Sequence, residues 1–227
     1  MTQLFRWAGA LLFLLSLLSM PALYFFRLGT PARPHDSTVR DAVTNVILFT
    51  IFALHHSVMA RSGAKAWLTR FVPAALERSV YVWMASLLFL SVCLMWQPLP
   101  GIVWDLRGPG LALSLMQLFG LGLTVSAARR VGVRELAGLQ PPNPARPVEF
   151  RADGPFGLVR HPIYLGWVLL VFATPLMTSS HLLFAVVSTI YLVIAIPLEE
   201  ALLVKTFGEK YTAYQQQMRW RLIPGLW

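Results

Sequence analysis

Long apolar stretches, separated by short polar segments, dominate the pattern of this chain. A helix needs roughly 20 mostly apolar residues to cross a bilayer, and six stretches approach or reach that length. They run from Leu4 to Phe26, from Ala42 to Ala60, from Val80 to Trp96, from Leu111 to Ala128, from Ile163 to Met177 and from Leu182 to Leu198. The pattern predicts an all-α polytopic integral membrane helical bundle of about six spans.

The two ends of the pattern need separate interpretation. The first stretch could be a secretory signal, with small residues from Ser19 to Ala22, but its length and the topology of the later spans favour a retained span. The last two stretches are separated only by Thr178 to His181, which predicts a tight helical hairpin with Pro175 close to its turn. A cytoplasmic helical tail is expected to follow.

The composition supports a membrane protein. The chain is 56% hydrophobic and 13% charged, whereas soluble domains have about 25% charged residues. Its net charge of +9 does not indicate nucleic-acid binding, because the basic residues lie between apolar stretches and form no basic domain. The partner expected instead is the lipid bilayer, and the sequence does not determine the oligomeric state.

The distribution of Lys and Arg predicts an orientation. With six spans and the N-terminus in the cytoplasm, 15 basic residues lie on the cytoplasmic side and 4 on the outer side. Cytoplasmic segments are usually the more basic, so both termini are expected inside, at a bacterial inner membrane. The segment from Arg129 to Arg160 and the tail from Glu199 to Trp227 then share the cytoplasmic side. Within the first, the proline-rich residues Gln140 to Pro147 predict an extended connection.

Residues Arg160-His161-Pro162 precede an apolar stretch on this side. Proline is favoured in the first turn of a helix, so a helix is expected to begin at Pro162. A helix N-terminus with Arg160 and His161 beside it could bind a carboxylate or phosphate. The alternative is that the basic residues only anchor a span at the lipid headgroups.

Glu199 and Glu200 stand where the last span meets the cytoplasm. Acidic residues at a helix C-terminus oppose the helix dipole and repel each other, and a bound cation would relieve both penalties. The alternative is a solvated helix end, or pairing with Lys205 or an arginine of the loop.

Phe207, Tyr211 and Tyr214 share one face of the expected tail helix. They could form an aromatic wall that stacks on an adenine or a cation, or the apolar face of a helix lying on the membrane. Two further histidines, His55 and His56, lie late in the second span, where interhelical hydrogen bonding, substrate contact or metal binding are possible roles. Adjacent helix residues point about 100° apart and no motif has metal-ligand spacing, so no metal site is expected.

The run RHPIYLG, the hairpin, the segment EEALLVKTFGEKYTAY and the final RLIPG together resemble the isoprenylcysteine carboxyl methyltransferase and phospholipid methyltransferase superfamily. The resemblance implies a single membrane methyltransferase-like domain over residues 1–227, with a cofactor-binding end at about 148–227 for S-adenosylmethionine. It implies that His161, Pro162, Ile163 and Tyr164 line the cofactor site and that Glu199 or Glu200 holds the cofactor's amino-acid end. Phe156 stands where the family has a tyrosine, so it keeps the ring and lacks the hydroxyl.

The segments HHSVMAR, TRFVP and ERSVYVWMAS resemble, more narrowly, the bacterial methanethiol S-methyltransferases and their NnrU-like relatives. The resemblance implies S-methylation of a small thiol that enters from the membrane, with His56, Arg61 and Arg219 as candidates to assist. Residues Ser126 to Gln140 depart from it, which leaves the acceptor open. N-methylation of a phospholipid or amine, prenylcysteine-type carboxyl methylation and a non-catalytic NnrU-like factor are the alternatives. The carboxyl-methylating relatives carry an arginine one turn before the acidic pair, where this chain has Ala195-Ile196-Pro197.

Overall fold

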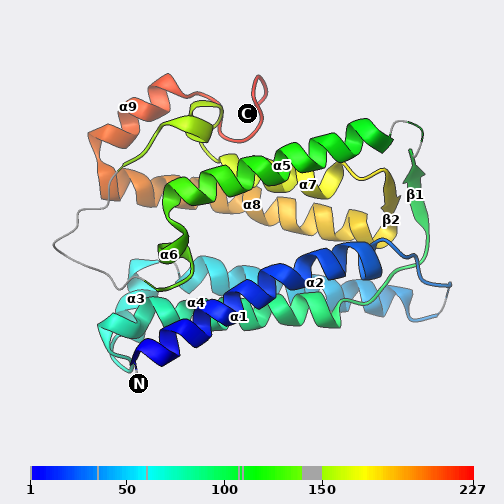
Figure 1. Cartoon of the computed structure of the whole chain (residues 1–227), viewed down its shortest axis with the longest axis horizontal. Helices are drawn as coiled ribbons and strands as arrows, with labels where there is room; N and C mark the ends of the chain where they lie inside the picture. Colours follow the sequence, from blue (N-terminus) through cyan, green and yellow to red (C-terminus); the bar gives the residue numbers. More distant parts are fainter. Residues whose placement is uncertain (1, 35, 60, 107, 109, 140–149) are drawn as a thin grey trace. The chain divides into compact units, whose positions relative to one another are not determined.

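The computed structural model describes residues 2–34, 36–59, 61–106, 108, 110–139 and 150–227. Its elements, in chain order, are α1 (Thr2–Ala22), the π-helical turns η1 (Leu23–Leu28), α2 (Thr38–Met59), α3 (Ser62–Leu68), the 3₁₀ turn η2 (Ala74–Leu76), α4 (Glu77–Met95), β1 (Ile102–Asp105), α5 (Gly110–Val131), α6 (Val133–Leu136), the 3₁₀ turn η3 (Gly154–Gly157), α7 (Pro162–Phe172), β2 (Leu176–Thr178), α8 (Ser179–Phe207) and α9 (Glu209–Gln217) (Figure 1). The two short strands pair in a two-stranded sheet.

Among the described residues, five helical segments are long and apolar enough to cross a membrane. They coincide with five of the predicted stretches, so the all-α polytopic membrane fold is confirmed. The remaining stretch, from Ile163 to Met177, differs. It contains α7, which has 11 residues and is therefore only about 17 Å long.

The predicted turn of the last hairpin is misplaced. The sequence placed it at Thr178 to His181, but α7 ends at Phe172 and α8 already begins at Ser179. Pro175 explains the early end of α7, because proline has no N–H for a helical hydrogen bond and keeps the preceding residue out of the helical conformation. The extended connection predicted for Gln140 to Pro147 lies outside the described residues.

The chain forms two compact units. The first contains α1 to α4 and α6, together with the described residues of 177–183. In it, α4 packs against both α1 and α2. The approach of α1 to α4 is close, since a Cβ atom at Gly9 would lie 2.7 Å from the indole nitrogen of Trp83.

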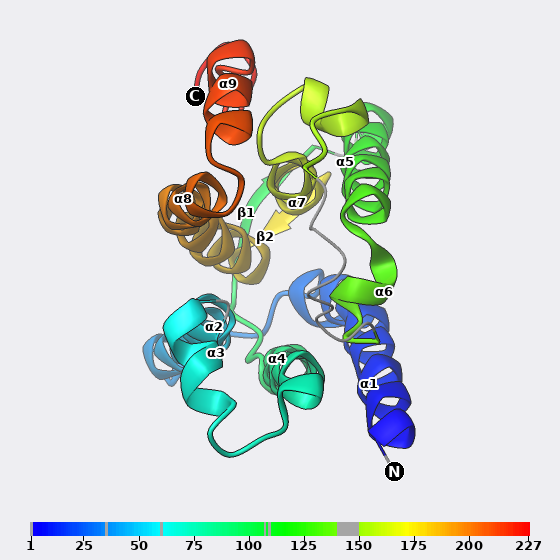
Figure 2. The same cartoon turned by 90° about the vertical axis from the view of Figure 1, so that its left-hand side faces the viewer.

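The second unit contains α5, α7, α9 and most of α8. Figures 1 and 2 both show α7 between α5 and α8. Two glycines bring α5 and α7 together, because a Cβ atom at Gly166 would lie 2.4 Å from the carbonyl oxygen of Gly120. On the other side of α7, the indole N–H of Trp167 donates to the hydroxyl of Ser188 at 3.0 Å.

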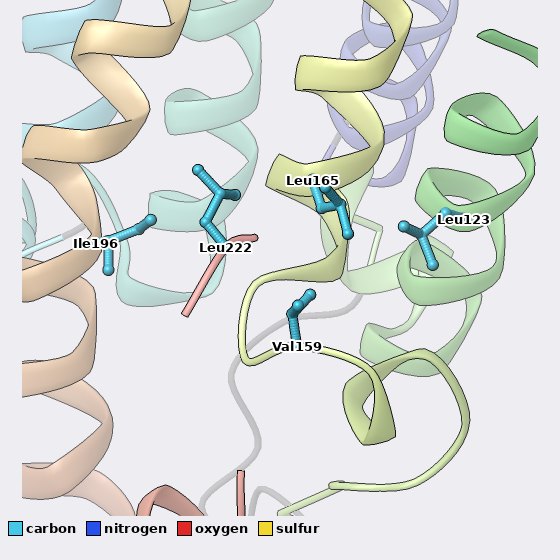
Figure 3. Close-up of a cluster of buried hydrophobic side chains, with 5 residues drawn as sticks. All are labelled: Leu123, Val159, Leu165, Ile196 and Leu222. Carbon is cyan, nitrogen blue, oxygen red and sulfur yellow. The ribbon is translucent and has the colours of Figure 1, made fainter. Parts of the chain in front are cut away.

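The second unit contains a cluster of buried apolar side chains. It consists of Leu123, Val159, Leu165, Ile196 and Leu222 (Figure 3). These residues come from α5, the segment before α7, α7 itself, α8 and the C-terminal segment. The cluster therefore joins the start of α7 to the C-terminal tail, where the polar residues singled out by the sequence also lie.

Candidate functional site

The start of α7 has the geometry that its sequence predicts. Pro162 is the first helical residue and His161 is the N-cap. The backbone N–H groups of Tyr164 and Leu165 donate to the carbonyl oxygen of His161 at 3.1 and 3.0 Å. These bonds fix the first turn, and the side chains of His161 and Tyr164 stack with ring centroids 5.3 Å apart.

The acidic pair does not lie at a helix end as the sequence suggested. Helix α8 continues for seven residues beyond Glu200, to Phe207. The unfavourable interaction with the C-terminal end of the helix dipole, which falls off within the last turn, therefore does not apply to the pair. Glu199 lies 20 residues after Ser179, which is about 30 Å along a helix and close to the thickness of the hydrocarbon core. The apolar part of α8 therefore ends at Glu199, after a length that matches the hydrocarbon core.

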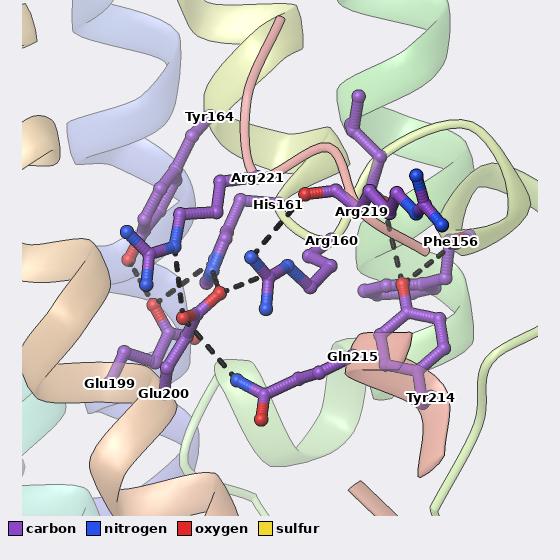
Figure 4. Close-up of polar contacts among 11 residues, drawn as sticks. Phe156, Arg160, His161, Tyr164, Glu199, Glu200, Tyr214, Gln215, Arg219 and Arg221 are labelled. Carbon is purple, nitrogen blue, oxygen red and sulfur yellow. Dashed lines mark hydrogen bonds and ion pairs between the residues drawn. The ribbon is translucent and has the colours of Figure 1, made fainter. Parts of the chain in front are cut away.

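Glu200 is enclosed by four side chains. Its carboxylate is 4% exposed and forms ion pairs with Arg160 at 3.2 Å and Arg221 at 3.1 Å. The imidazole Nε2 of His161 lies 3.3 Å from it, and the amide of Gln215 donates to it at 3.4 Å. Figure 4 shows these groups converging on one carboxylate. The interpretation of pairing with an arginine of the loop is confirmed for Glu200.

Glu199 has different surroundings. Its side chain is 42% exposed, and it accepts a hydrogen bond of 2.7 Å from the hydroxyl of Tyr164. The imidazole Nδ1 of His161 lies 3.7 Å away. No arginine or lysine among the described residues pairs with it, and its carboxylate is half-exposed beside the start of α7.

The tail aromatics point inward. Tyr211 and Tyr214 are buried, and the ring of Phe150 contacts both, with centroids 5.9 and 5.5 Å apart. The phenol of Tyr214 donates to the carbonyl oxygen of Phe156 at 2.7 Å, and burial raises its pKa to about 12. It is therefore a hydrogen-bond donor at any physiological pH. A helix that only lies on the membrane would not bury both tyrosines. This alternative therefore fits the structure less well than an aromatic surface that faces a ligand site.

The hydroxyl of Tyr211 differs from that of Tyr214 in its hydrogen bonding. Its side chain is 2% exposed and its hydroxyl has no hydrogen-bond partner among the described residues. Burial, reinforced by the nearby Glu200 carboxylate, raises the pKa of this phenol. A buried, protonated donor without a partner is available to a ligand.

The structure brings together most of the residues singled out by the sequence. One group contains Phe156, Arg160, His161, Pro162, Ile163, Tyr164, Glu199, Glu200, Tyr211 and Tyr214, all within the second unit. Arg219 belongs to the same tail, but its guanidinium points away from the two carboxylates, while its carbonyl oxygen accepts from Arg160 at 3.5 Å (Figure 4).

His56 and Arg61 belong to the first unit. The phenol of Tyr81 on α4 and the Nδ1 of His56 on α2 share a hydrogen bond of 2.9 Å, which confirms interhelical bonding for one of the two histidines. The guanidinium of Arg78 lies 4.9 Å from the centroid of the Tyr81 ring. Arg61 is the N-cap of α3 and is exposed.

Sequence reasoning missed three members of the site: Arg221, Gln215 and Phe150. The spacing of Arg219 and Arg221 gave no signal that only Arg221 would reach the carboxylate, because residues two apart in an extended segment point to the same side. No local signal marked Gln215 or Phe150.

Comparisons with known proteins identify the family of this chain. A family model described as phospholipid methyltransferase matches residues 110–210. The chain is 41% identical over 196 residues to methanethiol S-methyltransferase 1 of Bradyrhizobium diazoefficiens, covering 83% of this chain and 68% of that protein. It is 39% identical over 184 residues to methanethiol S-methyltransferase of Mycobacterium tuberculosis, covering 78% and 75%.

A more distant relative is nurim of Pan troglodytes, 27% identical over 171 residues, covering 67% of this chain and 64% of that protein. No solved structure gives a significant match. The similarity to the bacterial enzymes extends over most of both chains, and the match to the family model covers α7 and α8. The chain is therefore an integral membrane protein that belongs to the family of methyltransferases that includes the bacterial methanethiol S-methyltransferases.

Proposed function

We propose that this protein transfers a methyl group from S-adenosylmethionine to a small thiol such as methanethiol. The observation that carries the proposal is the half-exposed Glu199 carboxylate, held by Tyr164 beside the first turn of α7. The names of the bacterial relatives supply the acceptor class.

The residues present fit the donor molecule. Its amino-acid end carries an ammonium, which suits the Glu199 carboxylate, since no arginine or lysine of the described residues pairs with it. The same end carries a carboxylate, which suits a helix N-terminus with basic side chains. The buried phenol of Tyr211, without a partner among the described residues, can donate to a polar group of the same ligand. When bound, S-adenosylmethionine supplies an electrophilic methyl group on a sulfonium.

The chain's own work is to bind, orient and exclude water. Tyr164 and His161 hold the Glu199 carboxylate in one direction, and the buried cluster at Val159 and Leu165 fixes the backbone that carries them. Correct placement of two reactants removes much of the entropic barrier to transfer. A thiol acceptor must also lose its proton. Arg219 belongs to the same unit as the site and is our candidate to assist in that step, whereas the roles of His56 and Arg61 stay predictions from the sequence.

The turn before the acidic pair disfavours an acceptor that carries a carboxylate. Ile196 lies fully buried in the apolar cluster, and Ala195 is buried beside it. Neither position offers a positive charge, so prenylcysteine-type carboxyl methylation is the less suitable reaction. The match to the phospholipid methyltransferase model favours N-methylation of a phospholipid or amine as the second candidate.

We place the site on the cytoplasmic face of a bacterial inner membrane, with both termini inside. The excess of Lys and Arg in the corresponding segments supports this orientation. We also propose that residues 1–227 act as one functional domain, with the acceptor reaching the site from the bilayer.

The test is calorimetric binding of S-adenosylmethionine and S-adenosylhomocysteine to detergent-purified protein. The wild type is expected to bind both, and Glu199→Gln, which keeps the shape and removes the charge, is expected to weaken binding at least tenfold. Binding of neither compound by folded protein would contradict the proposal. An acceptor screen with methanethiol, longer thiols, amines and phosphatidylethanolamine then separates the two candidate reactions.

A further inference from the structure

Two adjacent carboxylates of α8 meet very different charges. Glu200 lies within 3.2 Å of two guanidinium groups, those of Arg160 and Arg221. Two positive charges therefore already surround its one negative charge. A third cation approaching Glu200 would be repelled by both arginines. Within the described part of the chain, the groups beside Glu199 are a phenol and an imidazole.

The partners of Glu200 come from three separate segments. Arg160 and His161 precede α7, Gln215 lies on α9, and Arg221 lies in the C-terminal segment. Without this carboxylate, two arginines would lie close together with no charge between them. The carboxylate is thus the group that allows the three segments to meet.

Backbone hydrogen bonds join two of the same segments. The N–H of Arg160 donates to the carbonyl oxygen of Trp220 at 2.9 Å, and the N–H of His161 donates to that of Arg221 at 3.0 Å. These bonds lie directly before the first turn of α7. Backbone hydrogen bonds and the ion pairs of Glu200 therefore connect the same two segments, the tail and the start of α7.

We propose that the acidic pair has a division of labour. Glu200 is a positioning residue that fixes the C-terminal segment against the start of α7, and Glu199 is the carboxylate that binds the ammonium group of the methyl donor. The role of Glu199 rests on the proposed function, whereas the role of Glu200 does not depend on any ligand.

Hydrogen exchange of the ligand-free, full-length protein tests Glu200. In Glu200→Gln, peptides that cover residues 159–165 and 215–227 should exchange at least tenfold faster than in the wild type. Glu199→Gln is the matched variant, with the same chemical change one residue away, and should leave both peptides unchanged. Lys210→Gln removes an exposed positive charge of the same tail and should also have no effect.

Arg221→Gln provides a second test if Glu200→Gln does not fold. It removes one ion-pair partner of Glu200 and should accelerate hydrogen exchange of the same peptides. Where both variants fold, their effects on exchange should not add. Unchanged exchange in the folded Glu200→Gln variant, or in Arg221→Gln if only that one folds, would overturn the positioning role.

Binding of S-adenosylhomocysteine tests Glu199 separately. A wild type that binds, with affinity unchanged in Glu199→Gln, would overturn the assignment of the ammonium to Glu199. A folded wild type that does not bind would contradict the proposed function, while the exchange results would still decide the role of Glu200.

Discussion

At the scale of single residues, the hydroxyl of Tyr164 has a defined role. It donates at 2.7 Å to Glu199 and so directs that carboxylate. Its ring also stacks on His161. The ring and the hydroxyl can therefore be separated by a variant that changes only one of them.

Tyr164→Phe keeps the ring and removes the hydroxyl. Hydrogen bonds to charged groups contribute more than neutral ones, but water can replace part of this one because Glu199 is half-exposed. We expect a loss of about 1 kcal/mol, roughly a fivefold weaker affinity for S-adenosylmethionine, with unchanged thermal stability. Calorimetry and a melting curve measure both. An affinity equal to the wild type would show that the hydroxyl does not orient the carboxylate.

At the scale of elements, the crossing of α5 and α7 depends on two glycines. A Cβ atom at Gly166 would lie 2.2 Å from the hydroxyl oxygen of Thr124 and 2.4 Å from the carbonyl oxygen of Gly120. One of these obstacles is backbone, so the helices would have to separate. Since α7 carries His161 and Tyr164 at its start, the separation would also disturb the site.

Gly166→Ala should therefore destabilise the protein by about 1–3 kcal/mol, the usual cost of overpacking. Gly122→Ala is the control, because nothing lies within 4 Å of the added atom and alanine favours a helix more than glycine does. Thermal unfolding in detergent compares the two. A stable Gly166→Ala protein would show that the crossing tolerates a wider spacing.

At the scale of the whole molecule, we predict the orientation in the membrane from the distribution of Lys and Arg. The short helix α7 does not resemble a complete span, whereas the predicted placement of both termini inside needs an even number of crossings. Labelling of single cysteines decides this independently of any helix count.

We expect Thr30→Cys to react with a membrane-impermeant maleimide in intact spheroplasts, and Lys210→Cys to react only after permeabilisation. Both positions are exposed. The native Cys93, which is buried, is replaced by alanine in both proteins. Equal labelling of Lys210→Cys before and after permeabilisation would place the tail on the outer side.

The sequence alone determined the membrane fold, because apolar stretches of spanning length leave the backbone no alternative to helix in lipid. It also located the start of α7 at Pro162, since proline acts on the few residues next to it. The hairpin turn was misplaced although Pro175 was noticed, because apolar residues on both sides of the turn hide the end of a helix.

Only the tertiary structure distinguished the surroundings of Glu199 from those of Glu200. Glu199 and Glu200 are adjacent and chemically identical, and their different surroundings come from side chains 15 to 40 residues away along the chain. The same holds for Arg219 and Arg221, of which only the second reaches a carboxylate. A local pattern shows that charges are present, but their pairing depends on how distant segments pack.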